Sequence, residues 1–349
     1  MRRELSRAAA LSVIAAFAML HATAQDQDAD AVLLQQARAF FEKLPIHFGD
    51  PEHPVTPERV ALGKALFFDP RWSVDANVSC ATCHNPALYG GDALPKSIGV
   101  KGKQHPRNAP TVLNVASHVS ANWRGERKDV EDQAVTAAIG VFSTGHTEHA
   151  AWIAQIEAIR GYFPMFQRAF PNAAWPISPA NLGLAIGAYE RMLVTPAPFD
   201  AYLAGEISAL TPQARTGLRT FIETGCVACH SGAGVGGTSY RKFGVHMDYW
   251  KATGSKDIDK GRFDLTKNES DLYVFKVPGL RNVAMTAPYF HDGSVATLPE
   301  AVRVMASAQL GKSLTDGEVQ DIVAFLHSLT GELPNGFATA PALPPSGGR

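Results

Sequence analysis

The sequence has few cysteines, no excess charge of either sign and no apolar run long enough to cross a bilayer. Its 349 residues include four cysteines, 32 Lys plus Arg and 33 Asp plus Glu. Balanced charge gives no overall field that would attract nucleic acid or anionic lipid, so any docking charge must be local. The apolar stretch 8–20 is shorter than the ~20 residues of a membrane helix, and no later segment is apolar enough. We therefore expect neither nucleic-acid binding nor a membrane span.

The first 24 residues have the pattern of a cleavable export signal. Basic residues precede the apolar stretch 8–20, and the small-x-small sequence Ala22-Thr23-Ala24 follows it. A signal peptidase reads that order as a cleavage site, here after Ala24. The mature protein is then expected to be a soluble protein of the periplasm.

All four cysteines lie in two copies of Cys-x-x-Cys-His, with none left over. Four cysteines in an exported protein would ordinarily suggest two disulfides. The adjacent histidine favours covalent haem attachment instead, in which both thiols form thioethers and the histidine ligates iron. A thioredoxin-like pair needs no adjacent histidine, and a zinc site needs four ligands from nearby loops. The sequence thus predicts two haem c groups, held by Cys80, Cys83, His84, Cys226, Cys229 and His230.

Helix signals come in matched pairs, which indicates a duplicated architecture. Thr56-Pro57 and Thr211-Pro212 each open a stretch with helical apolar spacing ahead of a haem motif. The apolar spacing over 181–193 and 315–329 predicts a closing helix for each half. In the second closing helix, Thr315 and Glu318 form a capping box.

We therefore expect a mainly α fold of two cytochrome c-like helical domains, each with one covalent haem, packed around an interdomain interface. The Pro-rich stretch 195–198 cannot continue a helix and predicts the junction. The predicted organisation is a signal peptide over 1–24, an N-terminal domain over 25–198, a C-terminal domain over 199–335 and a disordered tail over 336–349.

Two further motifs lie between the second haem motif and the C-terminus: Val277-Pro278-Gly279-Leu280-Arg281-Asn282 and Ala287-Pro288-Tyr289-Phe290-His291-Asp292-Gly293-Ser294. With the two haem motifs, they make the chain resemble the bacterial di-haem cytochrome c peroxidases, a family that includes MauG-type enzymes. The resemblance runs from about residue 56 to 331. It implies that peroxide reacts at a low-potential haem on His84, and that a high-potential haem on His230 accepts electrons.

The same resemblance implies roles for three more residues. Met305, 14 residues after His291, is implied to be the sixth ligand of the second haem, and a thioether ligand raises the potential of haem iron. Trp123 is implied to relay electrons between the haems, and Gln133 to lie near the peroxide pocket. A lone Met or Trp more commonly fills a core, and that alternative stands beside each role.

A calcium ion between the domains is also implied. The resemblance places its ligands at Asn108 and at the backbone carbonyls of Thr286 and Pro288. Oxygen ligands of this kind suit calcium. The alternative is that Asn108 only caps a turn.

The sequence departs from the family at two positions near the first haem. Many members hold a distal histidine on that iron, but the matching position here is Val100, which cannot ligate iron. His105 lies close by, in the position of a family loop rather than in the ligand slot. We therefore expect a five-coordinate first haem that binds peroxide without prior reductive activation.

The second departure concerns the catalytic glutamate, which in the family follows the glutamine by ten residues. That position is Ser143, so another group within 137–149 should move the protons of peroxide cleavage. The nearest carboxylate is Glu148, with His146 and His149 beside it. These residues equally fit the solvated face of the next helix.

The leading functional hypothesis is an oxidoreductase that reduces hydrogen peroxide with electrons from a small periplasmic cytochrome c or copper protein. A second hypothesis is MauG-like oxidation of an aromatic residue in a partner protein. Val100 favours it, and Met305 disfavours it because MauG itself has tyrosine at that ligand position. The third is a di-haem electron carrier or sensor without turnover, for which Ser143 is the sequence support. Many relatives dimerise, so a homodimer is one expected assembly.

Overall fold

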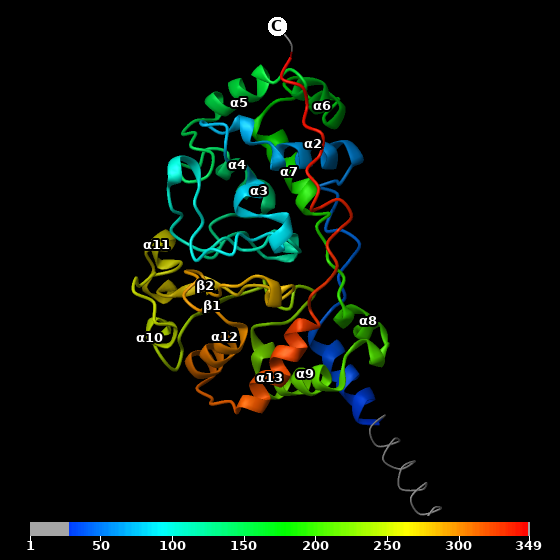
Figure 1. Ribbon diagram of the computed structural model, residues 1–349, viewed down its shortest axis with the longest axis vertical. Coiled ribbons are helices and arrows are strands. Elements are labelled where there is room, and N and C mark those ends of the chain that lie inside the picture. The colour runs from blue at the N-terminus through cyan, green and yellow to red at the C-terminus, as the bar shows by residue number, and fades with distance from the viewer. Residues whose placement is uncertain (1–27, 348–349) are drawn as a thin grey trace, which may run out of the picture.

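The computed structural model describes residues 28–347, so the predicted signal peptide over 1–24 lies outside the described residues. The described chain forms two helical lobes (Figure 1), as the sequence predicts. The N-terminal lobe contains α2 (Pro57–Phe68), α3 (Cys80–Cys83), α4 (Val130–Ala137), α5 (His149–Ala158), α6 (Tyr162–Ala169) and α7 (Pro179–Glu190). The C-terminal lobe contains α8 (Pro198–Ala204), α9 (Pro212–Thr224), α10 (Tyr249–Thr253), α11 (Phe263–Thr266), α12 (Leu298–Val304) and α13 (Asp316–His327).

The strands are short and confined to the side of the C-terminal lobe that faces the other lobe (Figure 1). β1 (Tyr240–Lys242) pairs antiparallel with β2 (Val274–Lys276), with Tyr240 opposite Lys276. Most of the remaining chain between helices forms 3₁₀ turns and irregular loops. The fold is therefore mainly α, and the strand pair serves to position residues at the interface between the lobes.

The two lobes repeat one packing arrangement. A Cβ atom placed on Gly63 of α2 would lie 1.8 Å from the carbonyl oxygen of Ala185 in α7. A Cβ atom on Gly217 of α9 would lie 1.7 Å from the carbonyl oxygen of Asp321 in α13. In each lobe the helix before the haem motif therefore meets the closing helix through a glycine, because only a residue without Cβ permits so close an approach. The internal duplication is confirmed.

The helix starts follow the predicted capping residues. Thr56 and Thr211 each precede a proline and accept a hydrogen bond from the backbone N–H three residues later. Thr315 caps α13 in the predicted box with Glu318. The predicted helix 181–193 begins slightly earlier and ends earlier, as α7, because Ser178 caps it and Pro179 takes its first position.

The junction between the lobes is held by two asparagines in equivalent places. The Thr195 hydroxyl is buried and accepts hydrogen bonds from the side-chain amides of Asn114 and Asn282, each at 2.8 Å. Both asparagines have left-handed backbones, with φ of 57° and 61°. One asparagine comes from each lobe, so this threonine fixes the two lobes to the same point of the connecting segment.

Both ends of the described chain cross to the opposite lobe, which corrects the predicted domain boundaries. The helix over 28–40 belongs to the predicted N-terminal domain, yet Leu33, Ala37 and Phe41 pack in the C-terminal core against Phe199 and Phe325. In Figure 1 this segment lies beside α8 and α9. Its apolar side therefore contributes to the second core rather than the first.

The tail over 336–347 is ordered against the N-terminal lobe, so the prediction of a disordered tail is wrong for these residues. Phe337 is 1% exposed and packs with Phe67, Tyr189 and Leu193. Farther along, Arg71 donates to the carbonyl oxygen of Pro344 at 2.9 Å. The tail runs upward past α2 and α6 in Figure 1. Its low charge and proline content therefore reflect extended packing on a surface.

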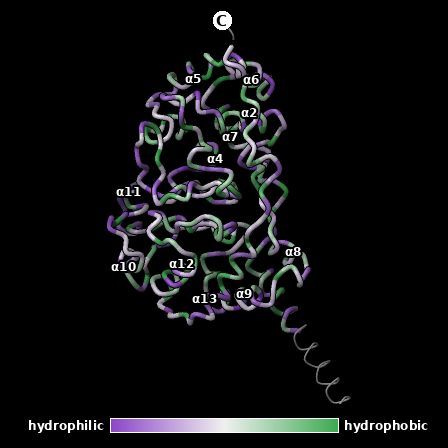
Figure 2. Tube along the Cα trace, in the orientation of Figure 1, coloured by the Kyte–Doolittle hydropathy of each residue, from purple (hydrophilic) through white to green (hydrophobic). Residues whose placement is uncertain are grey.

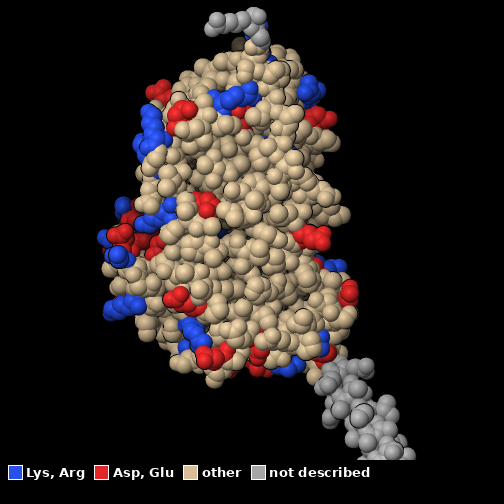
Figure 3. Space-filling view, viewed as in Figure 1, with Lys and Arg blue, Asp and Glu red and all other residues tan. Residues whose placement is uncertain are grey.

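Hydrophobic and hydrophilic residues are interspersed along the coloured part of the tube in Figure 2. Among residues 28–347, no helix has the length and hydrophobicity to span a membrane. On the face shown in Figure 3, charged side chains of both signs gather along one edge, over α10 and α11, and the centre is largely uncharged. That face presents no field of a single sign.

Candidate haem sites and the interface between the lobes

The second haem motif lies in the wall of a cavity at the interface. α9 ends at Thr224, and its C-cap Gly225, with a positive φ of 98°, turns the chain into the 3₁₀ turn Cys226–Ala228. Cys226, Cys229 and His230 all line the cavity, together with apolar side chains that include Phe221 and Leu326. An apolar wall with two free thiols and an imidazole is the donor set that a haem c requires.

The His230 ring is prepared to act as a ligand. Burial lowers its pKa to about 4, so the imidazole is neutral at pH 7. A buried neutral imidazole keeps one ring nitrogen without a proton, and that nitrogen can bind an iron in the cavity.

Met305 lines the same cavity. It begins the π-helical turn Met305–Gln309, which follows directly after α12. Such turns occur often at functional sites because the extra residue redirects a side chain. Met305 thus lines the same cavity as Cys226, Cys229 and His230, and its role as the sixth haem ligand stays a prediction.

The first haem motif forms the short helix α3, capped by Ser79. The Nδ1 atom of His84 lies 3.2 Å from the carbonyl oxygen of Gly90, so a proton on Nδ1 leaves Nε2 as the atom that can bind iron. Burial raises the pKa of the Cys80 and Cys83 thiols to about 12 and about 11, and neither forms a disulfide. These residues also fit a covalent haem.

Trp123 lies where the lobes meet. Its indole N–H donates to the carbonyl oxygen of Asn108 at 2.9 Å, and its ring centroid lies 6.3 Å from that of His291. Both Trp123 and His291 line the cavity of the second haem motif. The side chain is therefore fixed by contacts to both lobes rather than enclosed in one core.

The three predicted calcium ligands all line the cavity, as Trp123 does. Asn108 comes from the N-terminal lobe, and Thr286 and Pro288 come from the C-terminal lobe. The backbone N–H of Asn108 donates to the carbonyl oxygen of His291 at 2.8 Å, and its side-chain amide donates to Leu94 at 2.8 Å. The Asn108 amide N–H is thus occupied, and its side-chain oxygen remains available as a ligand.

The loop over 137–149 packs against the segment that carries Val100. The carbonyl oxygen of Phe142 accepts hydrogen bonds from the Val100 N–H at 3.3 Å and from His105 at 3.0 Å. Val100 is 1% exposed and contacts Gly145. His105 is therefore held by the loop backbone, and the side chain in the family's distal-ligand position is aliphatic.

Within this loop the candidate proton-transfer residues have different surroundings. His146 is buried, with Nε2 2.8 Å from the carbonyl oxygen of Trp72. Glu148 is exposed at the N-cap of α5 and makes no side-chain hydrogen bond to the helix. Gln133 lies part-buried on α4. No hydrogen bond among residues 28–347 joins Glu148 to His146 or Gln133.

A buried carboxyl group that sequence reasoning missed lies close to the first motif. Glu190 ends α7 and is 5% exposed. Burial, followed by the charge of Glu131, raises its pKa to about 8. Its charge also contributes to the raised pKa of Cys80. No local signal marked this residue, because it occupies an ordinary helical position.

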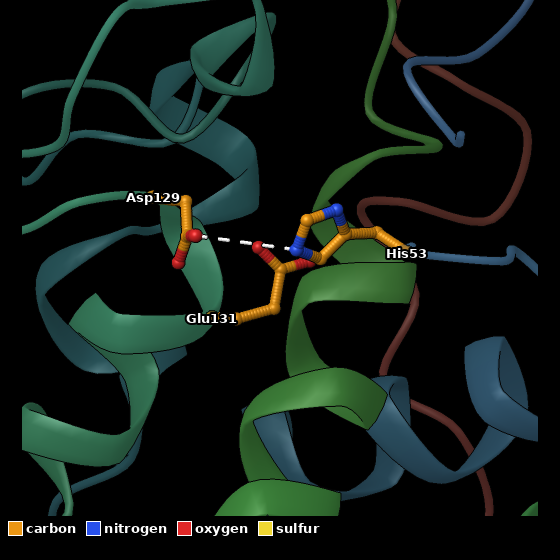
Figure 4. Close-up of side chains that lie close together, drawn as sticks. All are labelled: His53, Asp129 and Glu131. Atoms are coloured by element: carbon orange, nitrogen blue, oxygen red, sulfur yellow. Dashed lines mark ion pairs between the residues drawn. The ribbon is translucent and has the colours of Figure 1, made fainter. Parts of the chain in front are cut away.

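His53, Asp129 and Glu131 form another cluster of metal-binding residue types (Figure 4). The Glu131 carboxylate already accepts two hydrogen bonds from Arg191, at 2.7 and 3.0 Å. Asp129 caps α4, and His53 lies 3.0 Å from Asp50. The cluster is therefore an ion-pair network that joins α4 and α7 to the chain before α2.

The two lobes, each with thiols and a histidine arranged for one haem, define a di-haem c-type cytochrome. Residues 57–208 match the family of di-haem cytochrome c peroxidases, and residues 214–330 match the cytochrome c family. The chain belongs to the bacterial di-haem cytochrome c peroxidase family, and two haem c groups are its cofactors.

Similar proteins include both branches of that family. The cytochrome c551 peroxidase of Pseudomonas aeruginosa is 43% identical over 91% of each chain. The methylamine utilization protein MauG of Methylorubrum extorquens is 35% identical over 84% of this chain and 83% of the other. Among solved structures, a MauG-like protein associated with microbial copper homeostasis matches with a TM-score of 0.75 and 29% identity, over 86% of this chain and 97% of the other.

Proposed function

We propose that the protein reduces hydrogen peroxide to water in the periplasm, with electrons from a small cytochrome c or copper protein. The observation that carries the proposal is the difference between the two haem sites. Met305 lines the cavity of His230, whereas the aliphatic Val100 occupies the family's distal-ligand position near the first haem. One iron is thus suited to store an electron, and the other to bind a small molecule.

When bound, the haems supply one iron that reacts with peroxide and one that exchanges electrons. The chain orients each of them through a histidine, His84 or His230. Trp123, fixed between Asn108 and His291, provides an aromatic group on the route between the sites. The apolar lining that surrounds Met305 excludes water from the second site and favours the reduced state there.

Proton transfer at the first site is assigned to the loop over 137–149. The Nε2 atom of His146 lies 2.8 Å from a carbonyl oxygen and so carries its proton, which leaves Nδ1 as a buried base. Glu148 can transfer protons at the first haem only if the loop changes conformation and brings its exposed carboxylate inward. We expect His146→Gln to lower the peroxidase rate by about 10²-fold or more, the usual size of a general acid–base contribution. Glu148→Gln is the matched comparison, and a large loss in that variant alone would transfer the role to Glu148.

A calcium ion bound by Asn108, Thr286 and Pro288 is part of the proposal. Its support is that these residues come from both lobes and line the same cavity. Oxygen-only ligands of this kind prefer calcium. Chelation should therefore lower activity, and added calcium should restore it. If protein that is shown to contain no calcium keeps full activity, the calcium ion has no part in the proposed function.

The MauG-like alternative retains one specific support. With Val100 in the distal position, the first haem iron would have no distal protein ligand. Peroxide could then oxidise this haem directly, and the oxidised protein could oxidise an aromatic residue of a partner protein. Met305 in the second site weighs against it, because the family resemblance implies a tyrosine at that ligand position in MauG. A change of mass in a partner protein after peroxide treatment would favour this function over simple peroxide reduction.

The direct test is turnover of reduced cytochrome c by the purified di-haem protein with hydrogen peroxide. We expect oxidation of the cytochrome to depend on both proteins and on peroxide. A His84→Gly variant that keeps the second haem should lose the activity. A rate no higher than that of free haem would overturn the proposal, and gel filtration of the same sample would report whether a dimer forms.

A further inference from the structure

A buried lysine faces the second haem cavity without a carboxylate partner. Lys276 ends β2 at the interface and is 6% exposed, and its side chain lines the cavity. Among the described residues it forms no ion pair. The charge of the Glu126 carboxylate acts to raise the pKa of Lys276, but Glu126 is already paired with Arg124 at 3.2 Å. An ammonium group out of water is costly unless an anion accompanies it.

The neighbour of Lys276 is a histidine from the other lobe. Lys276 Nζ lies 3.0 Å from His118 Nδ1, across 158 residues of sequence. A neutral imidazole accepts one ammonium proton, and the other protons of Nζ remain free to donate. Burial, followed by the charge of Lys276, lowers the pKa of His118 well below its usual range, so the ring is neutral.

The His118 ring is held in the C-terminal lobe by two glycines. A Cβ atom on Gly237 would lie 2.1 Å from the ring, and one on Gly279 would lie 2.6 Å from it. The next residue, Val119, donates its N–H to the carbonyl oxygen of Gly237 at 2.8 Å. The backbone N–H of Lys276 donates to the carbonyl oxygen of Trp123 at 2.8 Å. The lysine–histidine pair is therefore a built contact between the lobes.

We propose that Lys276 and His118 together anchor a propionate of the second haem. Haem c carries two propionates, and the cavity that holds Cys226, His230 and Met305 also has both anchor residues in its wall. The propionate supplies the missing anion, and Lys276 donates to it while keeping its bond to His118. Because His118 belongs to the N-terminal lobe, the contact between the lobes helps set the potential of the electron-storing haem. Lys276 is in this sense a positioning residue.

The test compares Lys276→Met with Lys276→Arg in the di-haem protein, by redox titration of the second haem. Without the cation, the ratio of reduced to oxidised second haem at a fixed ambient potential should fall about tenfold, the effect of a unit charge that would act over on the order of 10 Å at an effective dielectric of ~20. A tenfold change corresponds to a midpoint about 59 mV lower for a one-electron couple. Lys276→Arg keeps the charge and should stay within about twofold of the parent.

A spectroscopic readout separates anchoring from a general charge effect. The propionate bending band of the second haem in the resonance Raman spectrum should shift in Lys276→Met and in His118→Gln, and return in Lys276→Arg. An unchanged band and potential in Lys276→Met would overturn the proposal, as would equal shifts in the Met and Arg variants. If Lys276→Met does not fold, His118→Gln decides by the propionate band, which should shift if the pair holds a propionate and stay unchanged if it does not. Neither measurement needs turnover, so this inference can fail while the proposed peroxidase function stands.

Discussion

Replacing Phe337 with alanine should release the C-terminal tail from the N-terminal lobe. The ring is 1% exposed against Phe67, Tyr189 and Leu193, and a buried Phe→Ala change costs about 3–5 kcal/mol. The other tail contacts include hydrogen bonds, such as Lys64 to Gly336 at 2.8 Å, each worth about 1 kcal/mol, and the packing of the buried Pro344 beside Gly161. The ring is therefore the largest single side-chain contribution to the free energy that docks the tail.

A detached tail leaves the rest of the lobe folded, which limits the loss to the docking free energy. We expect the free energy of unfolding to fall by about 3 kcal/mol, or a Tm lower by about 6–12 °C for a lobe of this size. Circular dichroism measures the Tm, and limited proteolysis detects the released tail. Leu343→Ala is the control, because Leu343 is 38% exposed and its loss should change stability by under about 0.5 kcal/mol. Equal behaviour of the two variants would refute the reasoning.

Two further predictions concern single side chains. Met305→Ala should convert the second haem from low to high spin and lower its potential, because a thioether ligand favours ferrous iron. Optical spectra measure the spin state and redox titration measures the potential. Met285→Ala is the control, because Met285 is exposed. A second haem that stays low-spin in Met305→Ala would exclude Met305 as a ligand. Glu190 should make stability fall as pH rises from about 4.5 to about 8, because the unfolded chain loses the proton near the lower value and the folded chain near the higher. Glu190→Gln should remove this slope, on the order of 5 kcal/mol in denaturant titrations, and an unchanged slope would contradict the raised pKa.

Local sequence signals predicted the parts of the fold that depend on local physics. A capping threonine followed by proline fixes where a helix begins, so the starts of α2 and α9 were predictable from Thr56 and Thr211. The Cys-x-x-Cys-His spacing predicted both haem sites, because thioether attachment requires those residues in that order. Family membership then confirms two haem groups and a mainly helical, two-domain fold.

Contacts between distant segments were not predictable, because no local pattern encodes them. The tail with Phe337 has the composition of a disordered end, yet one aromatic ring finds a site in the opposite lobe. The pair of His118 and Lys276 lies 158 residues apart and depends on the arrangement of the lobes. The roles of Glu148 and His146 also remain predictions, because the loop sequence allows either group to move protons.

The resting optical and electron paramagnetic resonance spectra of the purified di-haem protein test the central claim most directly. An open first iron near Val100 and a methionine-ligated second iron predict one high-spin and one low-spin ferric haem, with the high-spin signal lost at once on addition of hydrogen peroxide. Two low-spin haems that do not change with peroxide would contradict the proposed division between a reactive and an electron-storing site.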